Sequence, residues 1–132
     1  MTEMTAAKLG WLDLTTPDAV TVRDFYEAVC GWRAQPHDMG DYEDFGMQAE
    51  TGDTVAGICH ARGPNANLPP VWLPYFLVPS LEQSLASVRA SGGRVVEERP
   101  HPDGDGRGLA VISDPAGAHC VLWQNDPSPA GT

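Results

Sequence analysis

The sequence predicts an α+β fold built from two copies of a β-α-β-β-β unit. Two observations carry this prediction. Residues 11–33 correspond to residues 73–95 at a constant offset of 62, which aligns Pro17 with Pro79 and Gly31 with Gly93. Each copy also reads as a strand, a helix that begins near a proline and stops at a glycine, and three short β segments. A chain of 132 residues with 42% hydrophobic residues suits one domain of this kind.

The first helix is predicted to take Thr16 as its N-cap and Pro17 as its first residue, and to end at Gly31. Apolar side chains recur between them at helical spacing: Ala19, Val22, Phe25 with Tyr26, and Val29. The second helix is predicted to open at residues 78–80 and to stop at Gly92 and Gly93. Its apolar stripe is Leu81, Leu85 and Val88.

The β segments after the helices set the domain layout. They are expected at about 32–36, 43–48 and 54–60 in the first copy, and at about 94–98, 109–113 and 119–123 in the second. We therefore expect a flexible N-terminus (1–8), a first module (9–61), a linker (62–70), a second module (71–124) and a flexible tail (125–132).

Composition excludes several classes of function. The net charge of -10 and the scattered basic residues argue against a nucleic-acid partner. No apolar run is long enough to span a membrane, and the first residues lack the apolar segment of a signal peptide, so we expect a cytoplasmic protein. The three cysteines show no CxxC spacing. They predict reduced, buried thiols and argue against a structural zinc site.

The order of these motifs resembles the vicinal oxygen chelate superfamily, which includes glyoxalases, bleomycin-resistance proteins and extradiol dioxygenases. GWLDLTTPD and RDFYEAVCGW resemble the opening of one module, WLPYFLVPSLEQSLASVRASGGRVVEE that of another, and ISDPAGAHCVLWQ the closing hairpin. The resemblance extends from Leu9 to Trp123. It implies that two modules form a cupped mixed sheet with the helices outside and the ligand inside, and that the chain forms a homodimer. WLPYF, with the GW after the first helix, also resembles a subgroup that carries the label hydroxylase or glyoxalase-like.

Strand alternation separates two faces. One parity is nearly all apolar, as a face covered by helices requires: Leu12, Leu14, Phe76, Val78, Cys120 and Leu122. The other parity mixes aromatic with ionisable side chains: Trp11, Asp13, Leu73, Tyr75, His119, Val121 and Trp123. This second composition is typical of a ligand pocket, although a simply solvated face remains an alternative.

Many relatives hold one divalent metal ion through His, Glu or Gln side chains on the first and last strands of each module. The resemblance places those four positions on Trp11, about Gly57, Leu73 and Val121. None of these side chains can donate an electron pair to a metal. We therefore expect no metal and no other cofactor, as in the branch of drug-binding relatives.

Three polar groups remain on the pocket face as tentative catalytic residues: Asp13, Tyr75 and His119. Burial could make Asp13 a base, and His119 could act as an acid or a base near neutral pH. The alternative, which we favour, is that all three only bind one another or the ligand. The expected ligand-binding residues are Trp11, Asp13, Phe45, Cys59, Leu73, Tyr75, His119, Val121 and Trp123, with aromatic rings suited to a planar ligand.

The predicted function is the binding of a small, aromatic molecule without the usual metal, by sequestration or by metal-independent conversion. Two alternatives stay open. One is a metal-dependent lyase, isomerase or dioxygenase, in which the ligand positions are shifted or an improvised site forms from Asp13, Cys59, His60 and His119. The other is a non-catalytic accessory domain. His37 and His101, both expected in turns, are weak candidates for binding or gating.

Overall fold

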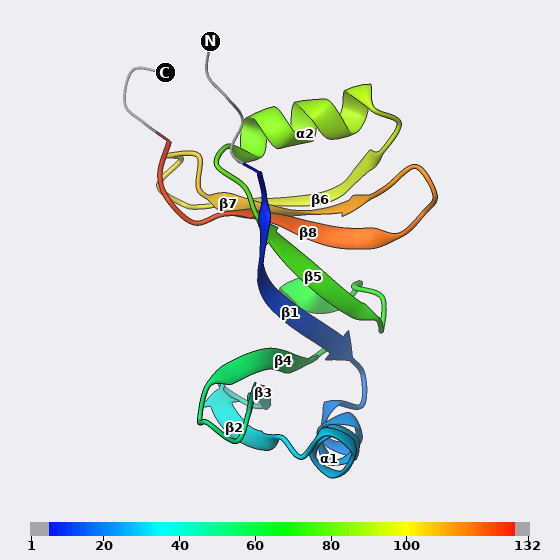
Figure 1. The fold of residues 1–132 in the computed structure, drawn as a ribbon, viewed down its shortest axis with the longest axis vertical. Helices are drawn as coiled ribbons and strands as arrows, with labels where there is room; N and C mark the ends of the chain where they lie inside the picture. Colours follow the sequence, from blue (N-terminus) through cyan, green and yellow to red (C-terminus); the bar gives the residue numbers. More distant parts are fainter. Residues whose placement is uncertain (1–5, 129–132) are drawn as a thin grey trace. The chain divides into compact units, whose positions relative to one another are not determined.

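The computed structural model describes residues 6–128 and contains, within them, eight strands and two α-helices (Figure 1). Its contacts divide the described chain into two compact units. The first unit holds residues 11–73. The second unit holds residues 6–10 together with residues 74–128.

The first unit contains one α-helix, one short 3₁₀ helix and a four-stranded mixed sheet. Its elements are β1 (Lys8–Thr16, of which residues 8–10 belong to the second unit), α1 (Ala19–Cys30), β2 (Arg33–Asp38), β3 (Glu43–Gln48), β4 (Thr54–His60) and the short 3₁₀ helix η1 (Gly63–Asn65). The strands lie in the order β2-β3-β4-β1. Only the β1–β4 pair is parallel.

The second unit repeats this arrangement. Its elements are β5 (Trp72–Leu77, of which residues 72 and 73 belong to the first unit), α2 (Leu81–Ala90), β6 (Arg94–Pro100), β7 (Gly108–Ser113) and β8 (His119–Gln124). The strands lie in the order β5-β8-β7-β6, again with one parallel pair, β5–β8. The predicted pair of β-α-β-β-β modules and the α+β class are therefore confirmed.

The two units also share their strand register. Asp13 on β1 is the partner of Gly57 on β4, and Tyr75 on β5 is the partner of Val121 on β8. Asp13 and Tyr75 are separated by the offset of 62 that relates the two copies in the sequence. Gly57 and Val121 are thus equivalent positions, which fixes the register that the sequence left loose around Gly57.

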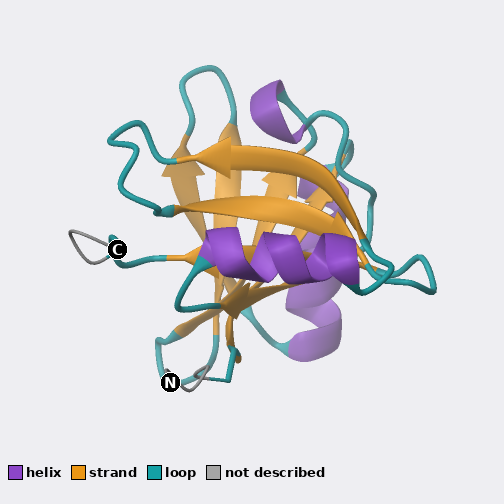
Figure 2. Ribbon diagram, turned by 90° about the horizontal axis from the view of Figure 1, so that it is seen from above, coloured by secondary structure: helices purple, strands orange, loops and turns teal. Residues whose placement is uncertain are grey.

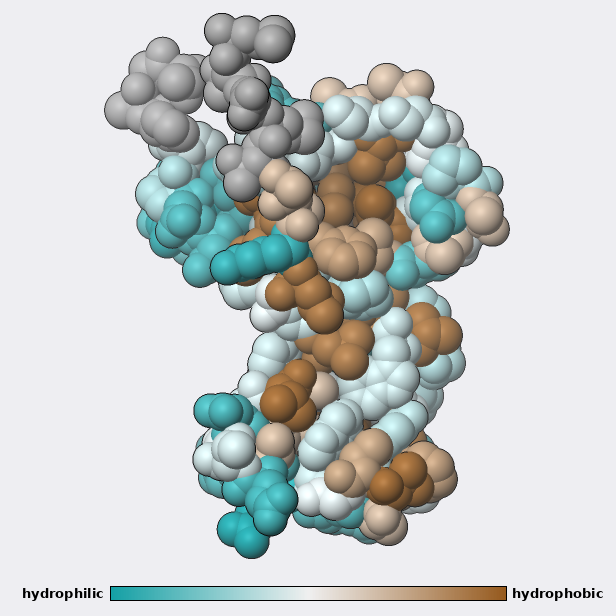
Figure 3. Space-filling view, viewed as in Figure 1, coloured by the Kyte–Doolittle hydropathy of each residue, from teal (hydrophilic) through white to brown (hydrophobic). Residues whose placement is uncertain are grey.

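The core of the second unit lies between α2 and one face of its sheet, as Figures 1 and 2 show for α2 and strands β6 to β8. Hydrophobic side chains gather below α2 in Figure 3. The buried members of the cluster are Leu81, Leu85, Ala110, Ile112 and Leu122. Phe76, Val78 and Cys120 pack against them, so the face predicted for these three and for Leu122 is confirmed.

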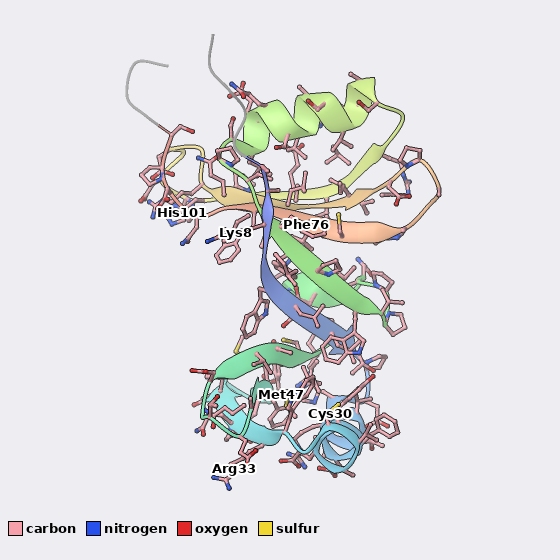
Figure 4. The ribbon with its side chains drawn as sticks, viewed as in Figure 1. Lys8, Cys30, Arg33, Met47, Phe76 and His101 are labelled. Atoms are coloured by element: carbon pink, nitrogen blue, oxygen red, sulfur yellow. The ribbon has the colours of Figure 1, made fainter. Side chains whose placement is uncertain are left out.

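The core of the first unit lies under α1 and corrects one prediction. Ala19, Met47 and Ile58 are buried there, with Met47 on β3 labelled in Figure 4. Phe45 is the register partner of Ile58 and belongs to the same cluster, with 4% of its surface exposed. The sequence assigned Phe45 to the ligand face, but strand alternation places its ring on the helix side.

Other differences are local. Thr16 is the last residue of β1 and α1 begins at Ala19, so the predicted cap at Thr16 is wrong; the N-cap is Asp18. Lys8 belongs to a strand, and the backbone N–H of Ser128 donates to the Asp105 carbonyl at 2.7 Å; the flexibility expected of residues 1–8 and 125–132 stays a prediction. The rest of those predictions, at residues 1–5 and 129–132, lies outside the described residues.

Two further sequence predictions can be compared with the described residues. All three cysteines carry free thiols, as predicted, but Cys30 is exposed and not buried. Neither α1 nor α2 is long and apolar enough to cross a membrane, a statement that covers residues 6–128.

Candidate functional site

A buried carboxyl group stands at the centre of β1. Asp13 exposes 8% of its surface, although the strand places it on the sheet face opposite α1. The indole N–H of Trp11 donates to its Oδ1 at 3.1 Å, and the thiol of Cys59 on β4 lies 3.4 Å from its Oδ2. Trp11, Asp13 and Cys59, three residues that the sequence assigned to the ligand face, are therefore in direct contact.

Gly57 provides the space that this carboxyl group occupies. A β-carbon at position 57 would overlap Oδ1 of Asp13 and would lie 3.2 Å from the Trp11 ring. The absence of a side chain on β4 thus lets the Asp13 side chain fold across the neighbouring strand. In a strand interior, a glycine of this kind often marks the close approach of another group.

A second buried acid lies two strands away from Asp13. Asp44 on β3 exposes 8% of its surface, and its Oδ1 accepts the backbone N–H of His60 at 2.8 Å. Because Phe45 points to the helix side, Asp44 has the same parity as Asp13. We call the face that carries Trp11, Asp13, Asp44 and Cys59 the Asp13 face.

Two groups on the Asp13 face, Asp13 and Cys59, have raised pKa values. Burial raises the pKa of Asp13, hydrogen bonds from Trp11 and Cys59 oppose that rise, and the charge of Asp44 adds to it. Burial also raises the pKa of the Cys59 thiol, and the two aspartates raise it further. The Cys59 thiol is therefore a hydrogen-bond donor and not a thiolate nucleophile at neutral pH.

The other predicted site residues belong mainly to the second unit. Tyr75 lies opposite Val121 on the β5–β8 pair, and His119 begins β8 opposite Ser113 of β7. Both side chains are half-buried. The Trp123 ring lies near the backbone of Gly10, within 3.4 Å of where a β-carbon would be. Asp13 is a residue of the first unit, so the convergence of Asp13 with Tyr75 and His119 stays a prediction.

The four positions that the resemblance assigns to a metal ion carry no side chain that fits one. Leu73 and Val121 are almost completely buried hydrocarbons, Gly57 has no side chain, and Trp11 directs its N–H to Asp13. An indole N–H and alkyl groups offer no lone pair to a divalent cation. The space next to Gly57, where a ligating side chain of β4 would extend, is taken by the carboxyl group of Asp13.

His37 and His101, both expected in turns, lie in different kinds of element. His37 lies in β2 and not in a turn, and its Nε2 lies 3.0 Å from where a β-carbon of Gly46 would be. His101 lies in the loop after β6, labelled in Figure 4, with Asp103 and Asp105. Arg107 forms ion pairs with both of these aspartates, which offsets part of their charge.

The sequence predicted neither the role of Asp44 nor the space that Gly57 leaves for the Asp13 carboxyl group. The signal for Asp44 was present, because strict alternation from a helix-facing Phe45 would have put Asp44 beside Cys59 on the Asp13 face. Two cavities lie on the helix sides of the units. One of about 250 Å³ is lined by Leu81, Leu85, Leu109 and Arg107, among others, and another by Arg23, Glu27 and Phe45.

Comparison with known proteins identifies one family for this chain. Residues 11–122 match the model of a family described as a glyoxalase-like domain. "Putative glyoxylase CFP32" of Mycobacterium bovis is 32% identical over 118 residues, which cover 87% of this chain and 44% of that protein. The anthracycline biosynthesis protein DnrV of Streptomyces peucetius is 29% identical over 139 residues, which cover 94% of this chain and 49% of that protein.

These curated relatives are longer than the chain, which spans about half of their length. Among solved structures, a member of the glyoxalase/bleomycin resistance protein/dioxygenase superfamily from Vibrio splendidus matches with a TM-score of 0.59. It is 13% identical, and the match covers 91% of this chain and all of that one. At this identity the likeness concerns the fold alone.

Proposed function

This chain belongs to the glyoxalase-like domain family, and we propose that it binds a small aromatic molecule on the Asp13 face without a divalent metal ion. The observation that carries the proposal is the buried carboxyl group of Asp13, which Trp11 and Cys59 hold in the space that the absent side chain of Gly57 leaves. A few polar groups placed among aromatic and apolar side chains are typical of small-molecule sites.

The aromatic character of the ligand is inferred from Trp11. Its ring is half-buried and is fixed by the hydrogen bond to Asp13, so little conformational freedom remains to be lost when a planar molecule stacks on it. Stacking on such a ring contributes about 0.5–1.5 kcal/mol beyond the burial of area. Tyr75 and Trp123 of the second unit are further aromatic residues of the predicted ligand set.

Sequestration is the activity that the first unit supports better than conversion. Its cysteine on the Asp13 face has a raised pKa and is therefore a poor nucleophile. An acid-base reaction through Asp13, Tyr75 and His119 would need the three side chains around one reacting atom. We therefore assign binding as the function and keep these three residues as ligand contacts.

The proposal is tested by equilibrium dialysis of the untagged full chain against an anthracycline, a probe suggested by the name of one relative. We expect saturable binding of one molecule per chain in the presence of EDTA. The Trp11→Leu variant should bind roughly 2- to 12-fold more weakly, the loss equivalent to one stacking contact. Phe25→Leu, which removes an exposed ring on α1, is the matched control and should bind like the unaltered chain.

The competing metalloenzyme function is tested in the same preparation. The protein is reloaded with Mn²⁺, Ni²⁺ or Zn²⁺, dialysed, and analysed for retained metal. It is then assayed with the hemithioacetal of methylglyoxal and glutathione. Stoichiometric metal with turnover would overturn the proposal, and so would dialysis that detects no saturable binding of the aromatic probe.

A further inference from the structure

A cavity of about 250 Å³ in the second unit lies between α2 and β6, which are neighbours in Figures 1 and 2. Leu81 and Leu85 of α2 and Pro100 of β6 give it apolar walls, and the loop after β6 contributes Gly104 and Gly106. Ligand sites usually measure about 300–1,000 Å³. A cavity slightly below that range suits a molecule with one ring and a short chain.

The loop that borders this cavity is held in place by its own contacts. The backbone N–H of His101 donates to the Arg107 carbonyl at 3.0 Å. The backbone N–H of Ser128 donates to the Asp105 carbonyl at 2.7 Å. The Arg107 guanidinium also forms ion pairs with Asp103 and Asp105. The wall of the cavity is therefore formed before a ligand arrives, so binding has little loop ordering to offset.

The first unit has a smaller cavity on its own helix side, and a cation of the chain lies there. The volume is about 160 Å³, and the lining includes Arg23 of α1, Phe45 of β3 and two acids, Glu27 and Glu43. The Arg23 guanidinium lies over the Phe45 ring, with its Cζ 4.8 Å from the ring centre. The first unit thus places a cation on an apolar surface close to carboxyl groups, as a cation–π contact.

The second unit lacks both partners of this contact. The offset of 62 relates Arg23 to Leu85. The strand register relates Phe45 to Ala110, because their partners Ile58 and Leu122 follow the equivalent residues of β4 and β8. Leucine and alanine fill less space than arginine and phenylalanine, and neither carries a charge. The second unit therefore combines a larger cavity with an uncharged side chain where the first unit has its cation.

The charges around the larger cavity are acidic on balance. The lining and its ion-pair partners hold four carboxyl groups and two guanidinium groups: Glu82, Glu98, Asp103, Asp105, Arg89 and Arg107. Arg107 pairs with both aspartates, and Arg89 pairs with Glu98 at 3.5 Å. Glu82, in the first turn of α2, forms no ion pair within residues 6–128. A cationic ligand is thus complementary to this cavity, and an anionic one is not.

We propose that the cavity between α2 and β6 binds a small aryl- or alkylammonium ion. Its apolar part lies against Leu81 and Leu85, and its ammonium group lies beside Glu82, which supplies the unpaired negative charge. The ligand would provide the cation that Arg23 provides in the first unit. This site belongs to the second unit and does not include the Asp13 face, so the inference goes beyond the proposed function and does not rest on it.

The experiment compares three probes of one shape and different charge: 3-phenylpropylamine, 3-phenylpropan-1-ol and 3-phenylpropanoate. Each is titrated at neutral pH into the full chain with ¹³C-labelled methyl groups, and the methyl shifts of Leu81 and Leu85 are followed by NMR. We expect saturable shifts, with the amine bound roughly 2- to 5-fold more tightly than the alcohol, the effect of one exposed ion pair. This preference should shrink in about 0.5 M NaCl.

Three substitutions locate the site. Glu82→Gln should remove the preference for the amine and leave binding of the alcohol unchanged. Glu50→Gln, at an exposed acid in a turn of the first unit, is the matched control and should keep the preference. Ala110→Leu, which adds bulk at the position equivalent to Phe45, should weaken all three probes, with its fold checked by circular dichroism. If that variant does not fold, Glu82→Gln and the methyl shifts still decide.

Several results would overturn the inference. Titrations in which the methyl groups of Leu81 and Leu85 do not shift saturably with any probe would show that the cavity takes no such ligand. Equal affinity for amine and alcohol, or a preference that survives Glu82→Gln, would remove the assigned charge. Tightest binding of the carboxylate would show that an arginine is the recognising group. Trp11→Leu should change none of these titrations, which keeps this test separate from that of the aromatic site on the Asp13 face.

Discussion

At the scale of single residues, the Asp13 carboxyl group and the missing side chain at Gly57 depend on each other. Gly57→Ala places a methyl group where Oδ1 of Asp13 lies, so the carboxyl group must leave its contacts with Trp11 and Cys59. We expect a loss of about 1–3 kcal/mol in the free energy of unfolding, measured by urea denaturation. In an Asp13→Ala background the same substitution should destabilise much less, and additive effects in this double-mutant cycle would contradict the arrangement.

Because its pKa is raised, Asp13 should make the folded chain less stable as the pH rises. The folded chain binds the Asp13 proton more tightly than the unfolded chain does, so stability is highest below the unfolded pKa and falls as the pH rises through the folded pKa. Each unit of such a shift corresponds to about 1.4 kcal/mol. Asp13→Asn should therefore stabilise the chain at neutral pH and remove this part of its pH dependence. Unfolding curves at several pH values check it, and an unchanged dependence would refute it.

The thiol of Cys59 should be unreactive for the same electrostatic reason. Burial raises its pKa first, and the charges of Asp13 and Asp44 raise it further. Iodoacetamide should modify the exposed Cys30 well before Cys59, with the sites and rates followed by mass spectrometry. Asp44→Asn removes one of the two charges and should speed the reaction at Cys59 relative to Cys30. A rate at Cys59 equal to that at Cys30 in the unaltered chain would contradict this environment.

At the scale of the elements, the two helices begin in different ways. Ser80 caps α2, since its Oγ accepts the backbone N–H of Gln83 at 3.2 Å, whereas the Asp18 side chain makes no such bond at α1. Ser80→Ala should lower the free energy of unfolding by about 1 kcal/mol. Asp18→Ala is the matched control and should change it little. Thermal or urea unfolding measures both, and equal effects would argue against the cap at Ser80.

The elements also show what sequence patterns can and cannot predict. The bounds of β3 and β4 follow from turns rich in Gly and Asp, and the start of α2 follows from residues 78–80 before an apolar stripe. Thr16 offered an equally good cap signal, but pairing of Thr16 with His60 extends β1 through it, so tertiary context prevailed over local preference. Phe45, expected among the ligand-binding residues, lies in the core under α1, where its pairing with Ile58 places it.

At the scale of the whole molecule, the repeat predicts topology better than chemistry. The offset of 62 predicted two units with one topology. Asp13 and Tyr75 follow that offset, and their strand partners Gly57 and Val121 occupy equivalent places in the two sheets. The side chains at these equivalent positions differ. In the first unit the Asp13 carboxyl group lies over Gly57, whereas in the second unit Val121 is a buried hydrocarbon. The burial of Asp44 could not be predicted from spacing, since it depends on contacts between strands that are distant in sequence.

The absence of ligating side chains at Trp11, Gly57, Leu73 and Val121 leads to a prediction for the whole chain. A metal ion that binds only the folded state at a thousandfold excess over its dissociation constant stabilises it by about 4 kcal/mol, which would raise the melting temperature by several degrees. We expect the same melting temperature for untagged protein in EDTA and in excess Mn²⁺, Ni²⁺ or Zn²⁺. A metal-dependent rise would contradict the assignment of these four positions if it persists in the His101→Ala variant. A rise that His101→Ala abolishes would instead locate the ion in the loop with Asp103 and Asp105, and would leave the Asp13 face without metal.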